Sequence, residues 1–138
     1  MIRRALTLAL ASLLPTTALA GRGVWPCIGE QDFITAAAPL CDLRAGQGWT
    51  VVRSTDEPAD AIAAHMPAAV LLLGDDSTAE DASFPGLLRA RRLPYHGWKT
   101  THPQHFSSDS AYGELDQDGI PDIPVGRIPA RTAGDVSA

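Results

Sequence analysis

The 138-residue sequence predicts an α/β fold, in which a parallel-type sheet is flanked by helices. Two kinds of segment alternate along the chain: short runs rich in Val, Leu and Ile, and longer stretches with helical spacing of apolar residues. Residues 69–73 are apolar without interruption and are followed by Gly74 and Asp75. Such a run is typical of a central parallel strand that is buried on both faces.

The first half of the chain contains two helix predictions around one strand. Residues 33–45 have a helical pattern, with a break expected at Pro39, and glycines end the helix before a β-branched strand at residues 49–53. Residues 59–65 form the body of the next helix. Its start has two equally good signals, a capping box of Ser54 with Glu57 and a cap at Asp56 ahead of proline.

The second half is less regular. Residues 77–110 contain several prolines and only one helix candidate, at 84–92, so we expect a long excursion that builds a binding surface or is mobile. Residues 123–129 form a short apolar strand bracketed by prolines. Thr132 and Asp135 then have the spacing of a helix cap, but only three residues follow. We therefore expect the fold to be incomplete at its C-terminal end.

Residues 1–20 have the pattern of a secretory signal peptide. Arg3 and Arg4 precede an apolar run, and the segment ends in Ala18-Leu19-Ala20, whose small residues suit a signal peptidase. The run is too short to favour a retained membrane anchor, which is the minor alternative. We expect a mature chain of residues 21–138 that is secreted or periplasmic and has no membrane attachment after cleavage.

The charge balance is acidic. The formal net charge of −5 becomes −7 when the two arginines of the leader are removed. An acidic surface repels phosphate, and residues 21–138 contain no basic stripe with interleaved aromatic residues. Nucleic acid is therefore excluded as an expected partner, and the acidic turn after residue 73 also argues against a flavodoxin-like phosphate site.

The chain has two cysteines, Cys27 and Cys41, and an oxidising compartment makes a disulfide between them the expected state. A loop of this length stabilises by roughly 3 kcal/mol in the chain-entropy model. The alternative is a reactive thiol at Cys41, because Pro39 suits the first position of a helix and a helix N-terminus lowers a thiol pKa. We favour the disulfide, since no histidine lies near Cys41 in the sequence.

Asp75, Asp76 and Arg127 are charged residues beside or within predicted strands. Asp75 and Asp76 follow the buried strand and so point to the edge where ligands bind in open α/β sheets; we favour a solvated turn that Ser77 caps, and a functional role is the alternative. Arg127 interrupts an apolar strand and therefore needs a carboxylate partner, with Asp75, Asp109 and Asp122 as candidates. We predict a structural ion pair at Arg127; direct recognition of a substrate carboxylate is the alternative.

The acidic turn at residues 116–122 is a candidate calcium site. Asp116, Asp118 and Asp122 surround Gly119, which permits a sharp bend, and calcium prefers several carboxylate oxygens. The turn lacks the full spacing of an EF-hand loop. The alternative is an ordinary turn rich in Asp, Gly and Pro that connects two elements.

Residues 107–132 resemble the gingipain-like cysteine peptidases, a secreted branch of the caspase-like superfamily. The similarity is carried by Ser108-Asp109, Tyr112-Gly113, Leu115-Asp116, Asp118-Gly119, Pro121-Asp122 and residues 125–129. In that family the catalytic His-Gly pair and the nucleophilic Cys follow this segment. The resemblance therefore implies that residues 21–138 are the N-terminal part of a caspase-like catalytic domain and include no catalytic residue.

His96-Gly97 imitates the catalytic pair, but it precedes the matching segment and does not follow a buried strand. We assign it no catalytic role. The resemblance implies a secreted cysteine peptidase that acts on proteins or peptides, of which this chain is a fragment without the Cys/His dyad. The alternative is a complete, non-catalytic secreted module that binds calcium or a protein partner.

Overall fold

The computed structural model describes residues 21–77, 83–95 and 104–137. The predicted signal peptide and His96-Gly97 lie outside the described residues. None of the helices that the structure describes is long and apolar enough to cross a membrane. The elements are, in chain order, β1 (Val24–Gly29), α1 (Gln31–Ala36), α2 (Ala38–Gly46), β2 (Thr50–Ser54), α3 (Pro58–His65), β3 (Val70–Leu73), β4 (Arg91–Tyr95), β5 (Gln104–Ser108), the 3₁₀ helix η1 (Ser110–Tyr112), β6 (Val125–Ile128) and α4 (Ala133–Ser137).

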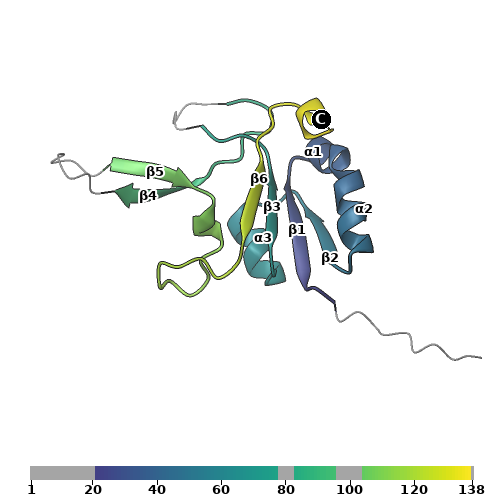
Figure 1. Ribbon diagram of the computed structural model, residues 1–138. Helices are drawn as coiled ribbons and strands as arrows, with labels where there is room; N and C mark the ends of the chain where they lie inside the picture. Colours follow the sequence, from purple (N-terminus) through teal and green to yellow (C-terminus); the bar gives the residue numbers. More distant parts are fainter. Residues whose placement is uncertain (1–20, 78–82, 96–103, 138) are drawn as a thin grey trace, which may run out of the picture.

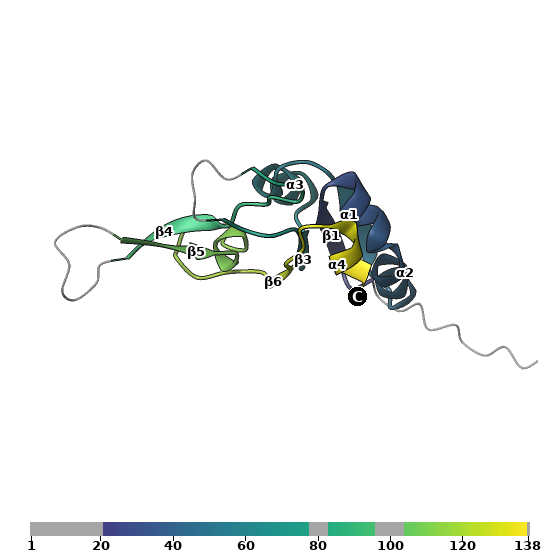
Figure 2. The ribbon, with the colours of Figure 1, turned by 90° about the horizontal axis from the view of Figure 1, so that it is seen from above.

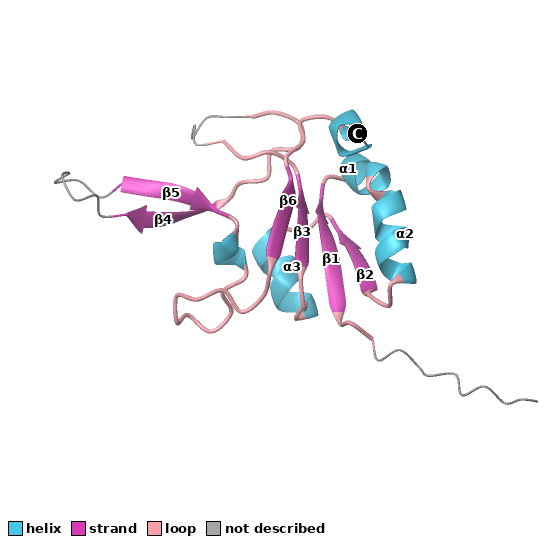
Figure 3. Ribbon diagram, viewed as in Figure 1, coloured by secondary structure: helices cyan, strands magenta, loops and turns pink. Residues whose placement is uncertain are grey.

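Four strands form one parallel sheet in the order β2-β1-β3-β6 (Figures 1 and 3). The predicted α/β fold with a parallel sheet flanked by helices is thereby confirmed. Strands β4 and β5 pair antiparallel and form a separate two-stranded sheet that extends away from the main sheet (Figure 1).

Helices cover both faces of the parallel sheet. Seen from above, α1, α2 and α4 lie on one face and α3 lies on the other (Figure 2). The side chains of β3 alternate between the two layers: Leu71 and Leu73 pack in the cluster of α1 and α2, whereas Val70 and Leu72 pack against α3. This double burial explains the uninterrupted apolar run in the sequence.

Strand β1 was not expected, because the sequence before residue 49 has no clear strand pattern. Its residues are buried from Trp25 to Gly29, and it lies between β2 and β3. Pro26 sits inside this interior strand, although proline cannot donate a ladder hydrogen bond. In a sequence, proline argues against a central strand. Pro26 is buried in β1, but its presence is the reason that β1 was not predicted.

Two predicted helices differ from the structure in their boundaries. The helix of residues 33–45 is two helices that meet at Ala37, with Pro39 in the first turn of α2, so the expected break is real but earlier. Helix α3 starts after Glu57, whose side chain makes no cap hydrogen bond, so both predicted caps are wrong. Ser54 and Asp56 instead hydrogen-bond to each other, with Ser54 Oγ donating to Asp56 Oδ2 over 2.8 Å.

The helix predicted at residues 84–92 is also wrong. Its first part is irregular chain that forms an isolated parallel bridge with Asp75, and its end is the start of β4. Asp75 N donates to Gly86 O over 3.0 Å, and Leu88 N donates to Asp75 O over 2.9 Å. Gly86 and Leu88 therefore run beside Asp75, just beyond β3, and its backbone satisfies polar groups that a helix would otherwise have paired.

Candidate functional site

The carboxyl edge of the parallel sheet is where a functional site is expected. The chain runs from β1 outward to β2 and then returns across β1 to β3, so the strand order reverses beside β1. In open α/β sheets ligands bind at such a point, beyond the carboxyl ends of the strands. A cavity of about 520 Å³ opens there, between the ends of β1 and β2 and the chain at Leu87 and Leu88.

Four carboxylates line this cavity, together with smaller polar groups. They are Glu30, Asp32, Asp56 and Glu57. Glu30 accepts a hydrogen bond from Gly86 N at 3.0 Å and so joins the end of β1 to the segment that follows β3. A cavity with this lining attracts cationic groups and repels phosphate, as the acidic composition of the chain also indicates.

Asp75 and Asp76 lie at the end of β3, as the sequence predicts, and both are tied into the surrounding chain. Arg131 Nε donates to Asp75 Oδ2 over 2.6 Å, and Ala90 N donates to Asp76 Oδ1 over 2.9 Å. The hydrogen bond from Arg131 lowers the pKa of Asp75. Burial acts to raise the pKa of Asp76, but the hydrogen bond from Ala90 helps to bring it below its ordinary value. Both groups are therefore ionised at neutral pH and serve as anchors.

Arg127 forms a two-pronged ion pair with Asp109, one of its three predicted partners. Its Nε and Nη2 atoms donate to the two carboxylate oxygens over 2.7 and 2.6 Å. Both side chains are mostly buried, with 11% of the arginine and 24% of the aspartate exposed. Burial disfavours the charged guanidinium, but the hydrogen bonds to Asp109 outweigh it and raise the pKa of Arg127.

The same guanidinium also binds backbone. Its Nη1 atom donates to Gly74 O over 2.9 Å and to Leu88 O over 2.7 Å. Arg127 thus connects β6, the end of β3, the chain after it and the start of η1 in one set of hydrogen bonds. Four acceptor atoms bind this guanidinium, and we call the set of contacts the Arg127 fork. Its full occupation argues for the predicted structural role and against substrate recognition.

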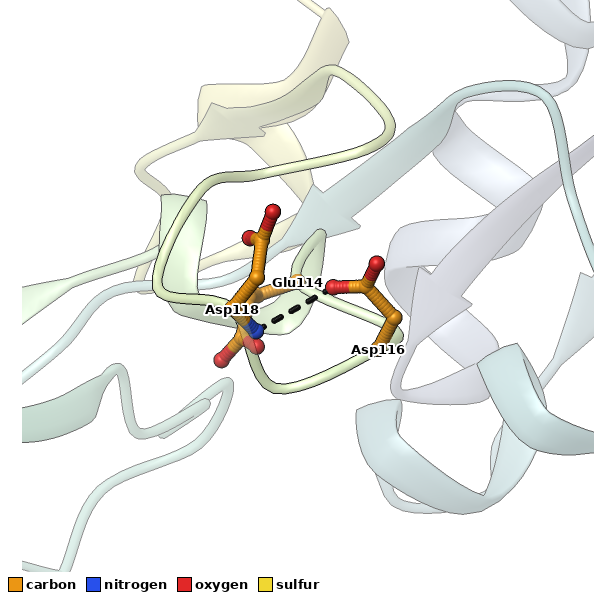
Figure 4. Close-up of side chains that lie close together, drawn as sticks. All are labelled: Glu114, Asp116 and Asp118. Atoms are coloured by element: carbon orange, nitrogen blue, oxygen red, sulfur yellow. Dashed lines mark hydrogen bonds between the residues drawn. The ribbon is translucent and has the colours of Figure 1, made fainter.

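The acidic turn brings three carboxylates together, but not the three that the sequence suggests. Oxygens of Glu114, Asp116 and Asp118 lie within 4.8 Å of one another (Figure 4). Asp122 lies at the base of the turn, where its Oδ2 accepts a hydrogen bond from Leu115 N at 2.8 Å. Glu114 was not predicted as a ligand because it precedes the Asp-Gly motif in the sequence. In the structure the turn bends back and brings Asp116 and Asp118 close to it.

The turn is held by its own carboxylates. Asp116 Oδ1 accepts from Asp118 N at 3.1 Å, as the dashed line in Figure 4 marks, and Asp118 Oδ1 accepts from Ile120 N at 2.7 Å. Glu114 Oε1 accepts from Gly119 N at 3.4 Å. Each carboxylate has two oxygens, so one oxygen holds the loop and a second is left for a cation or water.

Cys27 and Cys41 are buried thiols of one core cluster, on the face that α2 covers. Burial, together with the neighbouring Cys41, raises the pKa of Cys27. A thiol with 0% or 1% of its surface exposed cannot reach a peptide carbonyl. The alternative of a nucleophile at Cys41 is therefore unsupported, while the disulfide stays a prediction.

Sequence reasoning missed Arg131 and the cavity. Arg131 pairs with Asp75 and stacks over Phe84, with its guanidinium carbon 4.8 Å from the ring centre. No local pattern marks this residue, because the partners of its side chain are distant in the sequence. The cavity residues similarly come from three separate chain segments, and only the parallel order of the strands brings them to one edge.

Comparison with known proteins gives one family. The family model for peptidase family C25, the gingipain family, matches residues 27–138. Neither the comparison with curated proteins nor the comparison with solved structures gave a match. The match spans most of the chain, from β1 to the last helix, and so includes the sheet, the Arg127 fork and the acidic turn. The chain belongs to peptidase family C25, the cysteine peptidases of the gingipain type.

Proposed function

We propose that this chain is part of an exported cysteine peptidase, and that residues 21–138 supply the scaffold of its catalytic domain rather than its Cys/His dyad. The family match over residues 27–138 carries the proposal. In such an enzyme a cysteine thiolate attacks the peptide carbonyl, and a histidine takes up the thiol proton and delivers it to the leaving amine. The family implies a protein substrate.

The geometry of the described residues supports the scaffold role. Both thiols lie in the core, and the carboxylates at the end of β3 are bound to backbone and arginine. Arg127 of β6 donates to Gly74 O at the end of β3, and this contact restrains the carboxyl edge of the sheet. A rigid edge is what a catalytic dyad needs, because small displacements of reacting groups cost large factors in rate.

Expression of the complete reading frame tests this function. We expect hydrolysis of a fluorescent protein substrate that is abolished by iodoacetamide, with the alkylated cysteine at a position other than 27 or 41. Cys27→Ser and Cys41→Ser enzymes that remain folded should retain turnover per active molecule. Activity that survives alkylation, or that depends on Cys41 in a folded enzyme, would overturn the proposal, as would a reading frame without a further cysteine.

Export is a second element of the proposal, supported by the leader-like pattern of residues 1–20. Expression in a bacterial host with a functional secretory pathway should yield a chain whose first residue is Gly21. Edman sequencing of the product reads this directly. A chain recovered in the cytoplasm with its first twenty residues intact would contradict export.

We also propose that the acidic turn binds calcium, because three carboxylates converge within 4.8 Å. Calcium takes six to eight oxygen ligands, so backbone carbonyls and water must complete the site. In the complete peptidase this ion would brace the turn between η1 and β6. In the alternative function, a non-catalytic binding module, it would be the ligand itself.

Isothermal titration of the chain with calcium chloride tests the site. We expect saturable binding that Asp118→Asn weakens at least tenfold, since a charged ligand is removed. Asp42→Asn, which changes an exposed aspartate of α2 on the face of the sheet opposite to α3, serves as the control and should bind as the parent does. Absence of binding at millimolar calcium, or equal binding by both variants, would refute the site.

A further inference from the structure

Cys27 and Cys41 are placed so that a bond between them would connect two layers of the fold. Cys27 lies in β1, and Cys41 lies in α2, which covers that face of the sheet. Both side chains belong to the same buried cluster, and the proximity of Cys41 contributes to the raised pKa of Cys27. Exposure is 0% for Cys27 and 1% for Cys41, so no reagent in solution reaches either sulfur while α2 is in place.

We propose that Cys27 and Cys41 form a disulfide that fastens α2 to β1, and that this bond forms only while α2 is undocked from the sheet. The expected oxidising compartment and the presence of two cysteines already predict the pairing of Cys27 with Cys41. Their burial between β1 and α2 adds where the bond lies and when it can form. The inference is independent of peptidase activity, because neither cysteine belongs to the proposed dyad.

The oxidant is a disulfide compound, either a small one such as oxidised glutathione or a protein of the disulfide oxidoreductase class. The Cys41 thiolate attacks one sulfur of this disulfide, forms a mixed disulfide and releases one thiolate. The Cys27 thiolate then attacks Cys41 Sγ and displaces the second thiolate. The two protein thiols lose two protons and two electrons, and the external disulfide gains both and becomes two thiols.

Position in the sheet restricts this reaction in the folded chain. Cys27 pairs with Arg53 of β2 on one side and with Leu71 of β3 on the other, so neighbouring strands flank it and α2 closes the face above. Exchange needs a thiolate, and burial raises the pKa of Cys27. The reduced folded protein should therefore be inert, while the bridged protein should resist reduction for the same reason.

Position in the fold gives the reaction its direction. Cys41 lies in α2, which leaves the sheet on opening, whereas Cys27 stays in β1 between two neighbouring strands. When α2 opens, Cys41 is therefore the thiol that meets the oxidant first, and Cys27 is the one that resolves the mixed disulfide.

The test compares oxidation of the same full-length chain in two states. Reduced, urea-unfolded protein is diluted into a glutathione redox buffer, and reduced, folded protein is placed in the same buffer; intact mass and peptide mapping follow both. We expect the refolding sample to become a monomer lighter by two hydrogen atoms, with Cys27 and Cys41 in one linked peptide. The folded sample should keep both thiols at least tenfold longer.

Two leucines of α2 make a matched pair for the docking step. Leu40 packs against the buried cluster, whereas Leu43 is 57% exposed. Leu40→Ala should open α2 more often and accelerate oxidation of the folded chain at least tenfold, and Leu43→Ala should leave the rate unchanged. Both variants contain both thiols, and thiol titration in urea verifies that each starts reduced.

Three results would overturn the inference. A refolded chain that keeps two free thiols in oxidising buffer would show that the bond does not form. Disulfide-linked dimers in place of the monomeric bridge would show that the thiols do not pair within the chain. Oxidation of the folded protein as fast as the unfolded one, with no difference between the two leucine variants, would remove the requirement for undocking.

Discussion

The ion pair between Arg127 and Asp109 is the most connected contact among the described residues at the edge of the sheet. It is mostly buried and two-pronged, and its arginine also holds two backbone carbonyls. Removal of one partner from a buried pair leaves an uncompensated charge, which costs more than the pair itself contributes. The exposed pair of Arg53 with Asp42 has the same chemistry without the burial, with 47% and 76% of the side chains exposed.

This contrast predicts the effect of one substitution at two positions. Asp109→Asn should lower the free energy of unfolding by about 2 kcal/mol, toward the smaller end of values for buried pairs because some solvent reaches the site. Asp42→Asn should change it by less than about 0.5 kcal/mol, as exposed pairs do. Urea denaturation followed by tryptophan fluorescence measures both. Equal effects would mean that the Arg127 fork contributes no more than a surface contact.

Several aspartates make stability depend on pH. The pKa values of Asp75, Asp76 and Asp135 are all lower in the folded chain than the ordinary value, and backbone N–H donors of Arg131 and Thr132 are the cause for Asp135. A carboxyl whose pKa is depressed on folding stabilises the protein fully above its unfolded pKa. That contribution disappears as the pH falls through the folded value.

We therefore expect the urea midpoint to be constant from about pH 6 to about pH 5 and to fall steadily below about pH 4. Asp135→Asn removes one of these groups, so its midpoint should be lower at neutral pH and fall less on acidification. Denaturation curves at fixed ionic strength over this range provide the measurement. A midpoint that rises as the pH is lowered would have the wrong sign for this explanation.

At the scale of elements, Gly86 decides how closely the chain after β3 approaches α1. Its φ is +74°, and a Cβ atom there would collide with the ring of Phe33, which is 3% exposed. Its N–H donates to Glu30 just before α1. The contact needs glycine both for its backbone conformation and for its lack of a side chain.

Gly86→Ala should destabilise the protein by about 2 to 4 kcal/mol, which combines left-handed strain with overpacking against a buried ring. Gly119→Ala is the matched control, because Gly119 has a φ of +87° but nothing within 4 Å of the added Cβ atom. It should cost about 1 kcal/mol through strain alone. Thermal and urea unfolding measure the free energy of unfolding of both variants, and the difference between them is the cost of overpacking against Phe33. Equal losses of stability would show that the Phe33 ring moves aside freely.

Elements with local signals were predictable, and those that depend on distant partners were not. The cap of α4 is an example of success: Thr132 N donates to Asp135 Oδ2 over 2.8 Å, and Asp135 N lies 3.3 Å from Thr132 Oγ1, as the residue spacing predicts. Strand β1 and the hairpin of β4 and β5 were missed. Pro26 and Pro94 lie within these strands, and proline argues locally against strand structure even where burial or an edge position permits it.

For the whole molecule, the apolar runs and the family resemblance were sufficient to predict the fold class and the peptidase family. They could not select Asp109 among the three candidate partners of Arg127 or give the role of Glu114, since sequence patterns do not measure distances between loops. The acidic turn shows the limit clearly: the Asp-Gly motif indicated its location, while the fold determined which carboxylates converge. Site residues are therefore less predictable than strands because they depend on how loops meet.

The two sheets should also differ in stability within the native state. Strands β1 and β3 are interior strands with residues such as Ile28 and Leu72 fully buried. The hairpin of β4 and β5 presents exposed side chains such as Phe106. Its two strands pair with each other in a separate two-stranded sheet. A two-stranded ribbon with little apolar burial opens locally at low cost, whereas interior strands exchange only when the core unfolds.

Native-state hydrogen exchange should therefore show two levels of protection. We expect amides of Ile28 and Leu72 to exchange with the free energy of global unfolding, and amides of residues 92, 93 and 105–107 to exchange several kcal/mol more easily. Low concentrations of urea should accelerate exchange in β1 and β3 steeply and in the hairpin hardly at all, because local opening exposes little surface. Equal protection and equal urea dependence would mean that the hairpin unfolds only with the core, and that the excursion after β3 is as firmly part of the fold as the parallel sheet.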